Sequence, residues 1–345
     1  MTKTPPVTVV VTTYNNEKTI GETLKSVLAQ TYPNFEVLVS DNGSVDKTLE
    51  IVSSFKDPRI TVRHNIKKIK SDKWYIGGYD NYNGCLESGL IRGELVAFYH
   101  SDDVYEKDIV KKEVEFLMRN PEAGAVFAMG KIINKDGRVT GQHRVSGRLS
   151  AKSTYGLQDM VEDLLMDGNL CLLTPTFMAR TNIFETTGLF VEENFETSAD
   201  VQMWLRILQH YRIGIVNENL ILRRVGGVST TYNTLRTKPS DHFTVMDDFL
   251  AKKPAGLSIT KKMLRQYCYQ KTFDRILCAF HFSIQGNIPK AKDIINTSFS
   301  QYYFLALFEN MKLLRLKMLA LHVALFFGIN LGLGKPLGKM LYKLR

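Results

Sequence analysis

Residues 95–103 read LVAFYHSDD, and this stretch decides the fold. An apolar run of strand length, without Gly or Pro inside it, ends at the adjacent carboxylates Asp102 and Asp103. That pattern is typical of a buried parallel strand that ends at the sheet edge where open α/β sheets bind their ligands. Neighbouring carboxylates repel each other unless a cation lies between them, and hard oxygen ligands suit Mg²⁺ or Mn²⁺. Alternatively, Ser101-Asp102-Asp103 only caps the next helix.

The residues before this strand predict βαβ units. Short β-branched or apolar runs alternate with helical patterns, giving strands over 7–13, 35–40 and 59–63 and helices over 17–30 and 46–55. The short connections indicate a parallel sheet. The first two strands end in small polar residues, Thr13-Tyr14-Asn15 and Asp41-Asn42-Gly43, so the edge that Asp102 reaches carries further ligand-binding candidates. A plain turn also explains Asp41-Asn42-Gly43, since these residue types tolerate positive φ.

The residues after Asp103 continue the alternation less regularly. We predict helices over 83–91, 106–119, 157–166 and from 198 onwards, strands over 124–129, 171–179, 213–216 and 220–222, and a hairpin turn at 135–137. We expect residues 66–84 to form a substrate-side loop. Residues 139–155 are polar and basic without periodicity, which indicates either a mobile loop near an anionic ligand or a plain solvated loop.

The positive charge is concentrated in the last quarter of the chain. The 345 residues carry a net charge of +10, yet residues 252–345 contain 16 Lys and Arg against three acids, so residues 1–251 are slightly acidic. Cys85, Cys171, Cys268 and Cys278 show neither CxxC spacing nor the pattern of a secreted framework. They therefore indicate reduced thiols in a cytosolic compartment. The N-terminal residues do not resemble a signal peptide.

The tail suggests contact with a membrane. Residues 318–334 contain no Lys, Arg, Asp or Glu, but these 17 residues are fewer than the roughly 20 that a spanning helix needs. We favour a helix in the membrane interface, because flanking basic residues are attracted to an anionic cytoplasmic leaflet. A spanning helix is one alternative, and packing on the catalytic domain or on a second subunit is another. Nucleic acid is a weaker candidate, because the lysines are interleaved with large aliphatic residues.

Together these residues resemble the family 2 glycosyltransferases with the GT-A fold. Four motifs occur in the family's order over roughly residues 5–230. They are the opening strand with its Tyr-Asn signature (9–15), the base-reading loop (40–44), the strand into the DxD-type metal motif (93–103), and an acceptor-side segment (188–206) with Gly188-Leu189-Phe190, Asp200 and Trp204-Leu205-Arg206.

The resemblance implies an α/β fold in which a Rossmann-like, mostly parallel central sheet is flanked by helices and followed by a C-terminal helical extension. The catalytic domain would cover residues 1–235, with a nucleotide-sugar-binding half at about 1–105 and an acceptor half at about 106–235. Residues 236–345 would form the basic, apolar helical region.

The resemblance also implies a role for each motif. The nucleotide-binding residues would be Thr13, Tyr14, Asn15, Asp41, Asn42, Gly43, Asp102 and Arg224. Asp102 and Asp103 would bind Mn²⁺ or Mg²⁺, which neutralises charge on the departing nucleoside diphosphate. Asp200 would be the catalytic base that takes the proton of the acceptor hydroxyl. A UDP- or dTDP-sugar is favoured, because the Asp41 carboxylate can accept the ring N–H of uracil or thymine.

Three positions depart from the family's pattern. His100 stands where many relatives carry the first acid of the metal motif, a His often found shortly after Arg224 is absent, and Ser198-Ala199 precede Asp200 where an acid is common. A non-catalytic, membrane-associated binding or scaffolding member of the family is therefore one alternative, although the four key aspartates are retained. A nucleotidyltransferase is another, but it needs a Gly- and basic-rich triphosphate loop after the first strand, and residues 14–17 are not one.

The sequence thus predicts a metal-dependent, inverting glycosyltransferase. It would move a sugar from a nucleotide-sugar to a hydroxyl of a saccharide or lipid-linked saccharide acceptor, in bacterial surface polysaccharide assembly. We expect a cytoplasmic protein that lies peripherally on the inner face of the cell membrane through its C-terminal tail. We expect no nucleic acid partner, and the C-terminal helices offer a route to an oligomer.

Overall fold

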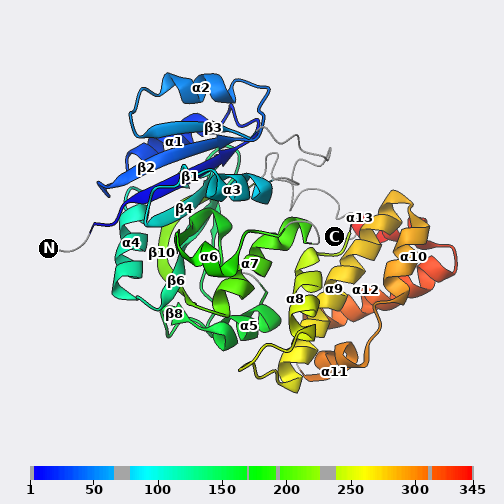
Figure 1. Ribbon diagram of the computed structural model, residues 1–345. Coiled ribbons are helices and arrows are strands. Elements are labelled where there is room, and N and C mark those ends of the chain that lie inside the picture. The colour runs from blue at the N-terminus through cyan, green and yellow to red at the C-terminus, as the bar shows by residue number, and fades with distance from the viewer. Residues whose placement is uncertain are drawn as a thin grey trace. The chain divides into compact units, whose positions relative to one another are not determined.

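The computed structural model describes residues 4–65, 78–168, 171–191, 195–225, 238–309 and 313–343. The chain divides into two compact units (Figure 1). The first comprises Met1–Asp163, Asp167–Val228 and Val245–Pro254. The second comprises Leu164–Met166, Ser229–Thr244 and Ala255–Arg345.

The first unit begins with four parallel strands. In spatial order they are β3 (Ile60–His64), β2 (Phe35–Asp41), β1 (Val7–Thr13) and β4 (Leu95–His100). The register places Thr13 opposite Asp41 and Thr12 opposite His100. The carboxyl ends of β1, β2 and β4 therefore reach the same edge of the sheet, where the sequence places the polar motifs.

Helices cover both faces of this sheet. On one face, α1 (Ile20–Leu28), α2 (Thr48–Ser54) and α4 (Ile109–Arg119) share an apolar core with Val9 and Ala97. On the other, α3 (Gly78–Glu87), α5 (Leu157–Met166), α6 (Ile183–Thr187) and α7 (Ala199–Leu208) pack with Val10 and Phe98. Side chains alternate between the faces of a strand, so a strand between two helical layers is apolar throughout. The predicted α/β architecture with flanking helices is confirmed.

Beyond β4 the sheet becomes mixed. β9 (Phe177–Arg180) lies antiparallel between β4 and β6 (Ala123–Ile133), and β10 (Arg212–Arg224) runs parallel to β6. The short strands β5 (Val104–Tyr105) and β8 (Thr154–Tyr155) pair with β10, and β7 (Val139–Gln142) pairs antiparallel with β6. The β6–β7 pairing confirms the hairpin turn predicted at residues 135–137.

Several predicted elements need correction. The interpretation of residues 139–155 as a loop throughout was wrong, because β7 and β8 lie there; β7 is polar and half-exposed or exposed, so it lacks an apolar pattern. The helix predicted over 83–91 is α3, which begins at Gly78 and ends at Glu87. Of the strand predicted over 171–179, only the end is a strand, because the 3₁₀ turn η1 (Thr174–Thr176) occupies the middle and β9 begins at Phe177. The strands predicted over 213–216 and 220–222 are parts of one strand, β10, whose pairing with β6 is irregular between them. Residues 66–77, most of the expected substrate-side loop, lie outside the described residues.

The second unit is helical. α9 (Lys261–Gln285), α10 (Ile288–Asn296), α11 (Gln301–Glu309), α12 (Leu313–Asn330) and α13 (Gly334–Lys343) surround a core of their own; α8 (Asp241–Ala251) straddles the division between the units. One face of α12 is part of this core through Met318, Leu325 and Ile329, and the buried His322 ring lies 2.7 Å from the Ser298 hydroxyl. In the part of the chain that the structure describes, no helix combines the length and apolarity needed to cross a membrane.

Candidate active site

The loop after β2 is built around the Asp41 carboxylate. This side chain is buried and accepts hydrogen bonds from the Gly43 and Ser44 amides and from the Ser44 hydroxyl, at 2.5–3.3 Å. Gly43 has a φ of +88°, and a Cβ atom there would meet nothing within 4 Å. The carboxylate therefore fixes a tight turn whose outer side is open to a flat ring.

The loop after β1 is tied to the first one. The backbone N–H of Asn15 donates to the Ser44 hydroxyl at 2.9 Å, and the backbone N–H of Asn42 donates to the Thr13 carbonyl at 2.9 Å. Tyr14 is 38% exposed, and the buried Thr13 hydroxyl has no hydrogen-bond partner among the described residues. An accessible aromatic ring and an unpaired hydroxyl at the sheet edge suit the base and ribose of a nucleotide.

The end of β4 brings together a possible metal site. One ligand atom each from His100, Asp102 and Asp103 lies within 4.8 Å of the others. Burial, followed by the charge of Asp102, raises the pKa of the buried Asp103 well above its usual range, while burial lowers the pKa of His100. Two carboxylates and a neutral imidazole at this spacing fit a divalent cation, whose charge would offset the repulsion between the carboxylates.

A helix cap does not explain the two acids. The next helix, α4, begins at Ile109, and its N-cap position is occupied by Asp108. Asp102 and Asp103 lie several residues earlier, with strand β5 in between. The acids therefore need another explanation, and a cation held between them is a candidate.

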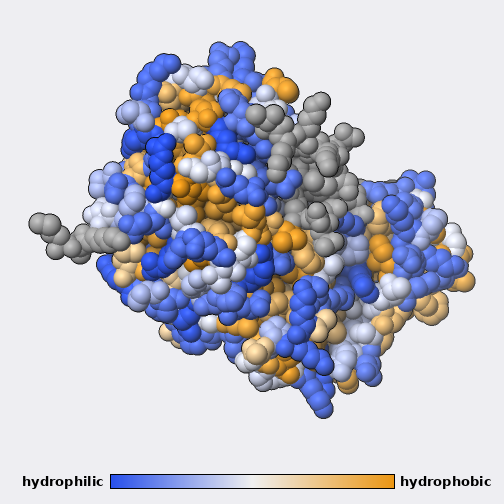
Figure 2. All heavy atoms as spheres, in the orientation of Figure 1, coloured by the Kyte–Doolittle hydropathy of each residue, from blue (hydrophilic) through white to orange (hydrophobic). Residues whose placement is uncertain are grey.

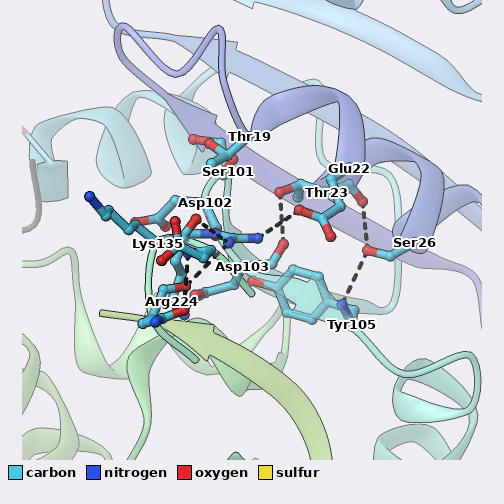
Figure 3. Close-up of polar contacts among 12 residues, drawn as sticks. Thr19, Glu22, Thr23, Ser26, Ser101, Asp102, Asp103, Tyr105, Lys135 and Arg224 are labelled. Carbon is cyan, nitrogen blue, oxygen red and sulfur yellow. Dashed lines mark hydrogen bonds and ion pairs between the residues drawn. The ribbon is translucent and has the colours of Figure 1, made fainter. Parts of the chain in front are cut away.

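Arg224 braces the acidic loop. In Figure 3 its guanidinium group lies beside Asp102 and reaches toward α1, where it contacts the Glu22 carboxylate at 2.6 Å. Its Nε donates to the Asp102 carbonyl at 3.0 Å, and its backbone amide donates to the Asp103 carboxylate at 2.7 Å. Thr23 of α1 adds a hydrogen bond from its hydroxyl to the Asp103 carbonyl at 2.7 Å. The contact with a diphosphate expected of Arg224 stays a prediction, because protein groups hold this side chain in the structure.

Arg223 is a residue that sequence reasoning missed. Side chains alternate along a strand, so Arg223 lies on the other side of β10 from Arg224. Burial is the main cause that lowers the pKa of His143 to about 4, and the positive charge of Arg223 adds to this shift. The same charge also acts to lower the pKa of His100 and of Asp103, although burial raises that of Asp103 overall. A cation this close to the acidic loop is placed to interact with an anionic ligand.

Asp200 lies in the first turn of α7. Its carboxylate accepts hydrogen bonds from the Thr174 hydroxyl at 2.6 Å and from the Val201 amide at 2.7 Å. Burial raises the pKa of Asp200, and the hydrogen bond from Thr174 opposes this shift. A carboxylate with a raised pKa is a stronger base than an ordinary aspartate, as a general base requires.

Tyr82 lies beside His100 of the possible metal site. Its hydroxyl lies 2.9 Å from the His100 Nε2 atom. Burial is the main cause that raises its pKa, and the charges of Asp200 and Asp102 both add to the shift. The charges of Asp200 and of Asp102 therefore both act on this one buried phenol. Tyr82 lies on α3 in a segment without a readable pattern, so no sequence signal identified it.

Asn83 of α3 holds the segment around Phe190. The Asn83 amide group donates to the Phe190 carbonyl at 2.8 Å and accepts from the Phe190 amide at 2.9 Å. The Phe190 ring stacks on Tyr79 with ring centroids 5.4 Å apart and meets Trp204 edge-on at 6.0 Å. This packing positions α7, and Asp200 with it, against α3.

Comparisons of this chain with known proteins point to one family of enzymes. The model of "Glycosyl transferase family 2" matches residues 8–187. Two curated relatives from Escherichia coli are named UDP-Glc:alpha-D-GlcNAc-diphosphoundecaprenol beta-1,3-glucosyltransferases. WfgD is 28% identical over 61% of this chain and 73% of its own length, and WfaP is 25% identical over 82% and 94%.

A crystal structure of a Staphylococcus aureus TarS fragment in complex with UDP-GlcNAc matches with a TM-score of 0.58 at 19% identity, covering 95% of this chain and 92% of that chain. The chain spans 54% of a longer TarS structure and 34% of an uncharacterized glycosyltransferase from Rickettsia conorii. The family match covers more than half of the 345 residues and includes Asp41, Asp102 and Asp103. The chain belongs to the family 2 glycosyltransferases and has their GT-A fold.

Proposed function

We propose that this glycosyltransferase moves a sugar from UDP-sugar, or from dTDP-sugar, to a hydroxyl group of a saccharide or lipid-linked saccharide in bacterial surface polysaccharide assembly. The observation that carries the proposal is the arrangement around Tyr82. The Tyr82 hydroxyl lies 2.9 Å from the Nε2 atom of His100, which forms a possible metal site with Asp102 and Asp103. The charges of Asp200 and Asp102 both act on this buried phenol.

The reaction would be a single displacement. The acceptor oxygen forms a bond to the anomeric carbon, the bond from that carbon to the diphosphate oxygen breaks, and Asp200 takes the proton of the acceptor hydroxyl. Attack opposite to the leaving group inverts the anomeric configuration. Mn²⁺ or Mg²⁺, held by Asp102 and Asp103, would supply charge neutralisation of the departing nucleoside diphosphate.

The nucleotide would lie on the two loops that end β1 and β2. Thr13, Tyr14 and Asn15 would contact the ribose and base, and the turn formed by Asp41, Asn42 and Gly43 would read the pyrimidine edge. UDP is supported over other nucleotides by the relatives, since the E. coli enzymes are named for UDP-Glc and TarS binds UDP-GlcNAc. Arg224 would stabilise the diphosphate if its contact with Glu22 opens, and Arg223 offers a second positive charge.

A lipid-linked acceptor would require the protein to work at a membrane surface. The two E. coli relatives are named for a diphosphoundecaprenol acceptor, which is such a lipid. In this chain the basic second unit supplies positive charge, and exposed apolar side chains lie on α12 and just after it: Leu316 (43% exposed), Val323 (43%), Phe327 (58%) and Leu331 (71%). Apolar residues are visible at the edge of this unit near α10 and α12 (Figure 2). We propose peripheral attachment to the cytoplasmic face through this surface.

Nucleotide binding tests the proposal. Calorimetric titrations of UDP, dTDP, GDP and CDP, each with and without Mn²⁺, should give the strongest binding for UDP and dependence on the metal. Asp102→Ala and Asp103→Ala should weaken binding in the presence of Mn²⁺, and Asp136→Ala, in the exposed turn before β7, should leave it unchanged. Absence of binding by all four nucleotides would contradict the proposal and favour a non-catalytic scaffold.

A further inference from the structure

The possible metal site includes a histidine, His100, beside its two carboxylates. His100 is the last residue of β4, so the strand fixes its backbone. Its side chain lies at the same edge of the sheet as Asp102. Its Nε2 atom lies 2.9 Å from the hydroxyl of Tyr82, which is 3% exposed and packs on Phe98 with ring centroids 4.6 Å apart. The imidazole therefore contacts a partner that is itself buried and packed.

We propose that His100 binds the active-site cation as a third protein ligand with Asp102 and Asp103, and that it makes the site prefer Mn²⁺ over Mg²⁺. This inference rests on the proposed function, because it concerns the cation that would assist sugar transfer. It adds a ligand and a selectivity that the paired carboxylates alone do not give.

The spacing permits one ion to contact all three residues. Ligands on opposite sides of a Mn²⁺ or Mg²⁺ ion are about 4.2–4.4 Å apart, because each bond is roughly 2.1–2.2 Å long. The ligand atoms of the three residues lie within 4.8 Å of one another, so small rotations of the side chains bring them onto one ion.

Tyr82 sets the orientation of the ring. A metal-binding histidine commonly gives its second ring nitrogen to a hydrogen-bond partner, which fixes both the tautomer and the direction of the lone pair. With Nε2 donating to the Tyr82 hydroxyl, the lone pair of Nδ1 is available to the cation. A histidine that served only as a hydrogen-bond partner for Tyr82 would need no acidic residues beside it.

The ligand type predicts the selectivity. Mg²⁺ prefers oxygen ligands and retains its waters, whereas imidazole suits later first-row ions and binds Mn²⁺ more readily than Mg²⁺. Replacing the imidazole by a carboxylate would give an all-oxygen site with more negative charge. The change His100→Asp is therefore expected to strengthen Mg²⁺ binding relative to Mn²⁺.

Electron paramagnetic resonance of bound Mn²⁺ tests this without any measurement of sugar transfer. The full chain with Mn²⁺ and UDP should show hyperfine coupling to a ¹⁴N nucleus, and this coupling should disappear in His100→Ala and His100→Asp. Competition with Mg²⁺, followed by the signal of released Mn²⁺, should show that the preference for Mn²⁺ falls by at least about tenfold in His100→Asp. The control His210→Asp, at an exposed position after α7, should retain both the coupling and the preference.

Two results would overturn the inference in distinguishable ways. Bound Mn²⁺ without nitrogen coupling, or with coupling that persists in His100→Ala, would exclude His100 as a ligand and leave the proposed transferase intact. No bound Mn²⁺ in the wild-type chain with UDP would remove the metal dependence itself, and the inference with it.

Discussion

At the scale of single residues, the proposed mechanism depends on Asp200. Asp200→Asn keeps the size of the side chain and removes its basicity, so we expect sugar transfer to fall by about 10²–10⁴-fold while UDP binding is retained. Because burial raises the pKa of Asp200, transfer in the wild type should decline with falling pH at a higher pH than an ordinary aspartate would give. The pH dependence of kcat/KM measures this, and unimpaired transfer by Asp200→Asn would exclude the proposed base.

Thr174 gives a second test, because its hydroxyl contacts the Asp200 carboxylate directly. Its hydroxyl donates to the carboxylate at 2.6 Å and thereby lowers a pKa that burial raises. Thr174→Ala removes this stabilisation of the charged form, so the acidic limb of the kcat/KM profile should move to higher pH. Thr174→Ser keeps the donor and should retain the wild-type profile. If the limb does not move in Thr174→Ala, a different group controls it.

At the scale of elements, β4 and α4 are joined through a buried acid. Glu113 of α4 is fully buried and accepts a hydrogen bond from the Tyr99 hydroxyl at 3.0 Å, and its other oxygen has no partner among the described residues. Burial raises the pKa of Glu113 well above 4.5. The folded chain therefore retains a proton that the unfolded chain releases, and stability falls as the pH rises from the unfolded pKa through the folded one.

This linkage predicts how Glu113→Gln behaves. The amide mimics the protonated acid, so the variant should gain stability relative to wild type as the pH rises, with a larger difference in Tm at pH 8 than at pH 5. Each unit by which a pKa is raised corresponds to about 1.4 kcal/mol once the pH exceeds the folded value. Glu115→Gln, on the exposed side of α4, should show no such trend. An equal shift in Tm at both pH values would mean that Glu113 is ionised in the folded protein.

The same scale shows what the sequence could predict. The early strands match to within one residue, because buried apolar runs bounded by polar turns carry a strong local signal. β7 could not be predicted, because a short polar strand at the sheet edge is decided by pairing with β6 rather than by its own residues. Asp41, Asp102, Asp103 and Asp200 could be proposed from the sequence because each lies at or just after the end of a strand or in the first turn of a helix. Tyr82, Asn83 and Thr174 were not, because their contacts join residues that are far apart in the chain.

At the scale of the whole molecule, the second unit has an apolar face that is exposed among the residues the structure describes. Leu316, Val323, Phe327 and Leu331 follow one another at intervals of four or seven residues, so they lie on one side of α12 and its end, opposite the core residues Leu325 and Ile329. The residues from 252 onwards carry 16 Lys and Arg against three acids. These side chains point away from the core of the second unit, so the burial of that core does not use them. An exposed apolar stripe beside basic residues is suited to an anionic bilayer.

Sedimentation with vesicles decides whether this stripe contacts a membrane. The full chain with Leu316→Gln, Val323→Gln and Phe327→Gln should bind phosphatidylglycerol vesicles at least about tenfold more weakly than wild type, because each side chain loses part of the roughly 1.5–3 kcal/mol gained on burial. Wild-type binding should weaken in 0.5 M salt, where the attraction of the lysines to the lipid is screened. Val45→Gln with Val139→Gln, at exposed sites of the first unit, should bind as wild type does. If the triple variant binds vesicles normally but changes from a dimer to a monomer, the stripe is a subunit interface, because the same apolar area then serves a second copy of the chain.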